Sequence, residues 1–175
     1  MRYLVIVLLT VAVLFAAENN KIHVPNRVVK SQPTELEKFL KHIAYRESNN
    51  TRNIVNKFGM MGKYQFSPNT VRGLGFKVTK KEFLQNEELQ DSVMVAYMRQ
   101  NNRELNSIIK KYDGKVVKGV QVTRSGILAA AHLGGSQSVV NYFSTDDWTG
   151  LTDANGTSIR EYMKTFSKYK LQNKI

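Results

Sequence analysis

The sequence predicts a mainly α-helical domain with at most a small β element, and three observations support this class. Apolar residues recur at intervals of three and four along several segments, as they do on one face of a helix. A Thr followed three residues later by Glu marks a helix start at Thr34 and again at Thr79. Only residues 114–123, GKVVKGVQVT, indicate a short strand or hairpin arm. The length of 175 residues and the 42% hydrophobic content fit one domain with a core and a terminal extension.

The N-terminal extension has the pattern of an export signal. Residues 1–17 carry one positive charge at Arg2, followed by an apolar run over residues 3–17 that only Thr10 interrupts. A run of this length is short for a membrane span and typical of a signal-peptide core. Cleavage near Ala17 is one interpretation, and an uncleaved membrane anchor is the other. Both place the rest of the chain in the periplasm or cell envelope, away from cytoplasmic nucleic acid.

The domain itself is predicted to begin after a linker. Residues 18–33 are polar and basic with two prolines, which indicates a linker to a domain over residues 34–175. A first helix follows the Thr34 capping box, and its apolar stripe consists of Leu36, Leu40 and Ile43, with Phe39 beside them. Continued by four residues, the stripe reaches Glu47. We therefore expect the carboxylate of Glu47 to face a core or a cleft.

The central part of the domain carries its own helix signals. Ser67 is a good N-cap and Pro68 suits the first helical position, and another helix follows the capping box at Thr79. A longer helix is predicted from about residue 87 to about residue 112, ended by Asp113 and Gly114. Its core candidates are Leu89, Val93, Ala96, Tyr97, Leu105 and Ile108.

The C-terminal part is predicted to hold three more helices. Residues 124–135, RSGILAAAHLGG, form an apolar helix closed by Gly134, and residues 136–143 form a short one. The last helix covers residues 158–170 and is expected to be capped by Thr157.

Charge and composition narrow the classes of partner. The 26 Lys and Arg exceed the 14 Asp and Glu, for a net charge of +12, which favours a polyanionic partner such as a cell-wall polymer. The basic residues are spread along the chain, which favours a generally basic surface over a nucleic-acid patch. The absence of cysteine excludes disulfides, thiolate metal sites and a Cys nucleophile. The three histidines lack metal-ligand spacing, so no metal or cofactor is expected.

Glu47 stands alone in its part of the sequence. The next acidic residue is Glu82, and the segment between them holds Gly59 and Gly62, which allow close approach of the backbone. In the simplest interpretation Glu47 is a helix-end carboxylate bonded to Arg46 or to a backbone amide. Its place on the apolar stripe favours a functional role, because burial raises the pKa of a carboxyl group and suits it to donate a proton.

Three blocks around this residue resemble a known signature. Glu47 and Ser48 form an E-S pair, GKYQF at residues 62–66 follows at fifteen residues, and SPNT at residues 67–70 comes next. This order is similar to the E-S, G-L-M-Q and x-P-x-T blocks of lytic transglycosylases. That family resembles goose-type lysozymes. The resemblance covers residues 34–164 and implies a lysozyme-like α-helical domain that cleaves the glycan strands of peptidoglycan.

The departures from this signature concern the neighbours of the acid. Lys63 and Tyr64 replace the Leu and Met of the family. The segment AAAHLGG, residues 129–135, takes the place of A-Y-N-A-G and puts Ala131 at its Tyr and His132 at its Asn. The family's Tyr lies near the catalytic acid. We therefore expect another tyrosine to compensate, and Tyr64 is the first candidate.

The resemblance implies that Glu47 is the general acid and base. Most glycosidases use two carboxylates, whereas a lytic transglycosylase uses one to break the bond between MurNAc and GlcNAc and to form a 1,6-anhydro product without water. A hydrolytic lysozyme (muramidase) on the same fold is the first alternative, with a second acid such as Asp91. A non-catalytic cell-wall-binding module is the second.

The same resemblance implies a set of substrate-binding residues in the groove of a monomer that binds peptidoglycan strands. These candidates are Ser48, Gly62, Tyr64, Gln65, His132, Gly134 and Tyr162. Two interpretations stay open for three of them. Ser48 either bonds to Glu47 or caps the helix, and Gln65 either binds N-acetyl groups or stabilises a turn. His132 either contacts the cleft or packs in the core. Tyr162 matches the Tyr of the family's E-T-x-x-Y segment, although Ser158 replaces its Glu.

Overall fold

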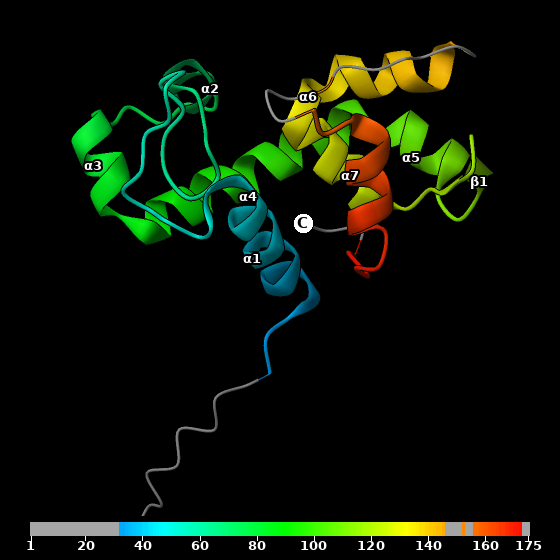
Figure 1. Ribbon diagram of the computed structural model, residues 1–175, viewed down its shortest axis with the longest axis horizontal. Helices are drawn as coiled ribbons and strands as arrows, with labels where there is room; N and C mark the ends of the chain where they lie inside the picture. The colour runs from blue at the N-terminus through cyan, green and yellow to red at the C-terminus, as the bar shows by residue number, and fades with distance from the viewer. Residues whose placement is uncertain (1–31, 146–151, 153–155, 173–175) are drawn as a thin grey trace, which may run out of the picture. The chain divides into compact units, whose positions relative to one another are not determined.

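The computed structural model describes residues 32–145, 152 and 156–172, and these residues confirm the mainly helical class (Figure 1). The predicted export segment over residues 1–17 and nearly all of the predicted linker lie outside the described residues. The described elements are α1 (Glu35–Ser48), α2 (Pro68–Gly73), α3 (Lys80–Gln85), α4 (Glu87–Glu104), α5 (Asn106–Tyr112), β1 (Val116–Val117), β2 (Val120–Gln121), α6 (Arg124–Ser144) and α7 (Ile159–Phe166). None of the helices in these ranges is long and apolar enough to cross a membrane.

The helix starts follow the predicted caps with one exception. Thr34 and Thr79 each form a capping box with the Glu three residues later, and Ser67 caps α2 with Pro68 at its start. The prediction that Thr157 caps the last helix is wrong, because Ser158 is the N-cap of α7. The reason is reciprocal bonding: the Ser158 hydroxyl accepts from the Glu161 amide, and the Glu161 carboxylate accepts from the Ser158 amide.

The predicted long helix over residues 87–112 is two helices, so this prediction is also corrected. The break lies at Leu105, whose φ of −96° and ψ of 10° are not helical. Leu105 is fully buried, and Ile109 of α5 is 2% exposed. The bend thus turns α5 so that its apolar residues stay in the core, beside α6.

A kink divides α6 as the sequence suggests, one residue later than predicted. Gly135 has φ 80° and ψ 161°, a backbone conformation that favours glycine, whereas Gly134 continues the first half of the helix. Gly134 faces α7, where an added Cβ would lie 3.1 Å from Ile159 Cδ1. The predicted hairpin is present as β1 and β2, paired antiparallel.

The helices pack around α4 and α6. Figure 1 shows α4 running between the group of α2 and α3 and the group of α5, α6 and α7. Helices α6 and α7 approach closely at Gly126, where an added Cβ would lie 2.6 Å from the Met163 carbonyl oxygen. Because α7 lies so close, residues far along the sequence are brought beside the end of α1.

Candidate active site

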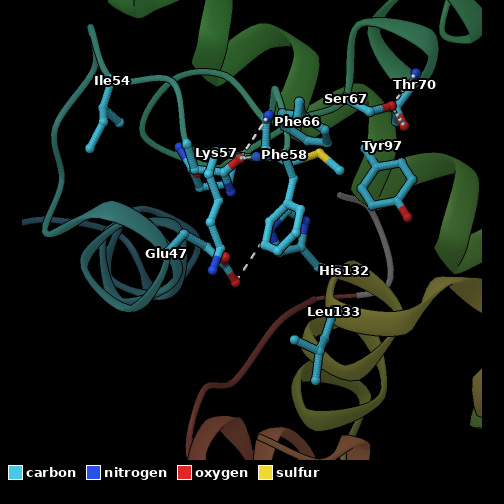
Figure 2. Close-up of a pocket in the computed structure, with 13 residues that line it drawn as sticks. Glu47, Ile54, Lys57, Phe58, Phe66, Ser67, Thr70, Tyr97, His132 and Leu133 are labelled. Atoms are coloured by element: carbon cyan, nitrogen blue, oxygen red, sulfur yellow. Dashed lines mark hydrogen bonds and ion pairs between the residues drawn. The ribbon is translucent and has the colours of Figure 1, made fainter. Parts of the chain in front are cut away.

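A pocket of about 660 Å³ opens where five segments meet: the end of α1, the loop before α2, the start of α2, the middle of α4 and the middle of α6 (Figure 2). Glu47 comes from α1 and Gln65 from the loop. Tyr97 comes from α4, and His132 and Leu133 come from α6. Figure 2 shows the carboxylate of Glu47 pointing toward His132 across the pocket.

The position of Glu47 follows from the apolar stripe of α1. Phe39 and Ile43 on this stripe are fully buried, and Leu40 is 8% exposed. Glu47, one turn further on, is 18% exposed and lines the pocket. Among the described residues that line the pocket, it is the only carboxylate.

A tyrosine from α7 holds this carboxylate. The Tyr162 hydroxyl donates a hydrogen bond of 2.6 Å to Glu47 Oε1. Burial raises the pKa of Tyr162 well above its usual value, and the negative charge of Glu47 adds to the effect. The phenol therefore stays neutral and remains a donor. The bond occupies one carboxylate oxygen and leaves the other for a second partner.

Tyr64 is not the compensating tyrosine, so that prediction is corrected. Its hydroxyl donates a 2.6 Å hydrogen bond to Asp91 Oδ1, and its ring is 2% exposed. Lys63 is also buried, with its Nζ 2.8 Å from Glu87 Oε1 and 2.9 Å from Asp91 Oδ1. The residues that replace the Leu and Met of the resemblance therefore fasten the loop to α4. Asp91 binds Tyr64 and Lys63 and does not line the pocket.

Two other predicted residues shape the loop rather than line the pocket. The Ser48 hydroxyl donates to the Lys63 carbonyl at 2.8 Å and accepts from the Thr51 amide at 3.0 Å, which joins α1 to the loop. Gly62 has φ 73°, and an added Cβ would lie 2.4 Å from Gln90 Oε1. A side chain at Gly62 would thus displace the Gln90 amide, whose Oε1 accepts from the Lys63 amide.

Gln65 lies in the pocket in a left-handed backbone conformation, with φ 53°. Its Nε2 donates to the Gly62 carbonyl at 2.8 Å, which fixes the side chain across the turn. The predicted turn-stabilising contact is present, and the side chain also borders the pocket. Gly134 packs against α7 and does not line it.

His132 is a buried wall of the pocket. Its side chain is 5% exposed, and its ring centroid lies 5.4 Å from that of Phe66 and 5.9 Å from that of Tyr97. Burial lowers the pKa of His132, and the nearby Glu47 charge opposes this only in part. The imidazole is therefore neutral near pH 7. Its Nε2 lies 3.8 Å from Glu47 Oε1 as a close neighbour rather than as an ion-pair partner.

Several residues that line the pocket were not predicted from the sequence as site residues. Between the two motif blocks, Asn56, Lys57 and Phe58 line the pocket, and Tyr97 lines it from α4. Tyr97 was predicted only as a core residue, and its hydroxyl donates to the Ala131 carbonyl at 3.2 Å. In the described ranges, no cluster of His, Asp and Glu side chains is arranged to hold a metal ion.

Comparison with known protein families gives a match over most of the domain. Residues 26–150 match the family model described as the transglycosylase SLT domain. No curated protein and no solved structure matches the chain. The family match includes Glu47 and the loop blocks, whereas Tyr162 lies beyond it, and its role beside Glu47 rests on their hydrogen bond.

Proposed function

The chain belongs to the transglycosylase SLT domain family, whose members are peptidoglycan lytic transglycosylases, and we propose that Glu47 is its catalytic acid and base. The observation that carries this proposal is the solitary position of Glu47 among the described residues that line the pocket. An enzyme of this class needs one group that first donates and then accepts a proton.

In the proposed reaction, the protonated Glu47 carboxyl donates its proton to the glycosidic oxygen between MurNAc and GlcNAc as the bond from C1 to that oxygen breaks. The 6-hydroxyl oxygen of the MurNAc unit then bonds to C1, and the Glu47 carboxylate takes the proton of that hydroxyl. The products are a 1,6-anhydro MurNAc end and a GlcNAc end with a free 4-hydroxyl. Glu47 is regenerated, and no water is consumed.

Tyr162 is a positioning residue in this scheme. Its hydroxyl bonds to Glu47 Oε1, so the proton of the acid form resides on Oε2, where it can reach the substrate. A neutral phenol supports both the carboxyl and the carboxylate forms by donating one hydrogen bond. The side chain can therefore hold the orientation of Glu47 through both proton transfers.

We propose further that the enzyme works outside the cytoplasm, in the periplasm or cell envelope. The apolar run over residues 3–17 supports export, either as a cleaved signal or as a membrane anchor. The substrate class also lies outside the cytoplasm. Fractionation of the native host should recover the protein with the envelope, and a soluble full-length cytoplasmic protein would contradict this proposal.

Replacement of the acid tests the catalytic assignment. Glu47→Gln should keep the fold and lower the rate of sacculus solubilisation by at least about 10²–10⁴-fold, the usual contribution of one general acid. Glu88→Gln, which removes an exposed carboxylate outside the pocket, is the matched control and should act as wild type. A Glu47→Gln enzyme within a few-fold of wild type would overturn the assignment.

A further inference from the structure

The loop before α2 contains a turn over residues 56–60 that the side chain of Asn56 stabilises. Asn56 Oδ1 accepts hydrogen bonds from the amides of Phe58 and Met60, at 2.9 and 3.0 Å. The Asn56 carbonyl accepts from the Gly59 amide at 3.0 Å, and Gly59 has φ 80°. Lys57 and Phe58 are thus held at the tip of an ordered turn.

Phe58 at this tip is unusually exposed for an aromatic residue. It is 59% exposed, although it borders the pocket that holds Glu47. Ile54, which is 39% exposed, borders the same pocket. Figure 2 shows these side chains on the loop side of the pocket and His132 and Leu133 on the side of α6. An exposed apolar rim continuous with a catalytic pocket marks a surface for a ligand.

Lys57 adds a positive charge to this rim. Its Nζ lies 5.1 Å from the centroid of the Phe58 ring, a cation–π contact that places the charge beside the aromatic face. Within the described part of the chain, the Lys57 ammonium makes no ion pair. The tip therefore offers one aromatic face and one available cation next to each other.

We propose that the Lys57–Phe58 tip binds the peptidoglycan strand beside the cleavage point, with Phe58 against the apolar face of a pyranose ring and Lys57 against a carboxylate of the peptide stem. This inference rests on the proposed function and names a substrate contact for the same pocket. A sugar presents C–H groups on one face, which suit the negative face of an aromatic ring. The locked turn keeps the ordering cost of such a contact low.

The two side chains should have separable effects. An aromatic contact contributes about 0.5–1.5 kcal/mol, which corresponds to about 2- to 10-fold in kcat/KM. Phe58→Ala should therefore lose activity to this extent on every glycan strand. An exposed ion pair contributes about 0.2–1 kcal/mol, about 1.5- to 5-fold, and is weakened by salt. Lys57→Gln should lose activity only where the stem carboxylates are free.

The test compares intact peptidoglycan strands with strands whose stem-peptide carboxylates have been converted to amides with a carbodiimide and ammonia. We expect Phe58→Ala to be impaired on both substrates and Phe58→Tyr to restore the rate. Lys57→Gln should be impaired only on the strands with free stem carboxylates. Tyr45→Ala and Lys77→Gln are the controls, since both residues are exposed and lie outside the pocket.

The outcomes separate this inference from the assignment of Glu47. If Glu47→Gln is inactive and Phe58→Ala cleaves both substrates as wild type does, the inference fails and the catalytic assignment stands. A Lys57→Gln enzyme equally impaired on both substrates would overturn the role of Lys57. Sedimentation of the Glu47→Gln protein with sacculi gives a readout that is independent of turnover. There, an added Phe58→Ala substitution should weaken binding, and unchanged binding would overturn the inference.

Discussion

At the scale of single residues, the contact between Tyr162 and Glu47 joins two side chains that are 115 positions apart in the sequence. The tyrosine comes from α7, whose first turn is fixed by the Ser158 capping box. The Arg46 guanidinium of α1 lies 5.7 Å from the centroid of the Tyr162 ring. The phenol is therefore held in place from both α1 and α7, as a positioning group requires.

Removal of the Tyr162 hydroxyl should slow turnover. Tyr162→Phe loses a hydrogen bond to a carboxylate, which is typically worth about 1.5–3 kcal/mol. We expect kcat on soluble glycan strands to fall about 10-fold or more, with KM nearly unchanged. Tyr64→Phe is the matched control, because its hydroxyl bonds to Asp91 outside the pocket. If Tyr162→Phe keeps the wild-type kcat, the positioning role is wrong.

The sequence predicted the position of Glu47 correctly, but it led to the wrong tyrosine as its hydrogen-bond partner. The apolar stripe of α1 predicted the inward position of Glu47, because helical periodicity sets direction. Tyr64 was chosen since its segment runs along the pocket, yet the side chain turns to α4, where Asp91 accepts its hydrogen bond. Tyr162 matched a motif, but its contact with Glu47 depends on the packing of α7, which no local pattern encodes.

At the scale of elements, the close contact of α6 and α7 determines where Tyr162 lies. Gly126 of α6 faces the backbone of Met163, one residue beyond Tyr162. No larger residue fits there without moving α7, because the neighbouring atoms belong to a backbone. The contact therefore links the packing of two helices to the geometry of the active centre.

Gly126→Ala should both destabilise the domain and impair turnover. Overpacking of this kind costs about 1–3 kcal/mol, which we expect as a lowered free energy of unfolding in urea. Gly73→Ala in α2 is the control, because nothing lies within 4 Å of its added Cβ. Gly126→Ala with the stability and kcat of wild type would show that the α6–α7 spacing is unimportant.

Most helix starts were predicted well from the sequence, whereas the break between α4 and α5 was not. A capping box is a local pattern of two residues, so Thr34 and Thr79 could be identified directly. The break at Leu105 has no glycine or proline, and it arises because α5 turns to bury its apolar face. The buried Met94 and Met98 were missed for the same reason, since tertiary packing selects the buried face of α4.

At the scale of the whole molecule, stability should fall in mild acid because two histidines resist protonation. Burial lowers the pKa of His132 and, together with Lys168 and Arg46, that of His42. The unfolded chain binds these protons near the ordinary pKa of about 6.5, whereas the folded chain binds them only at lower pH. The free energy of unfolding should therefore decrease as the pH falls below about 6.5.

The variant His132→Gln tests this dependence. One group contributes a slope of at most about 1.4 kcal/mol per pH unit, so the variant should lose less stability than wild type between pH 7.5 and 5.5 in urea denaturation. The remaining slope reflects His42, because the capping and ion-paired carboxylates have lowered pKa values and titrate below this window. An equal loss in both proteins would contradict a neutral, buried His132.

If one carboxylate cleaves the glycan strand without water, the masses of the products must show it. Purified sacculi should be digested with the wild-type enzyme, and the released muropeptides should be analysed by mass spectrometry. We expect 1,6-anhydro MurNAc ends, which are lighter than a reducing MurNAc by one water. Glu47→Gln should release none. Reducing MurNAc ends as the main wild-type product would instead show hydrolysis with a second catalytic group, and would contradict cleavage by Glu47 alone.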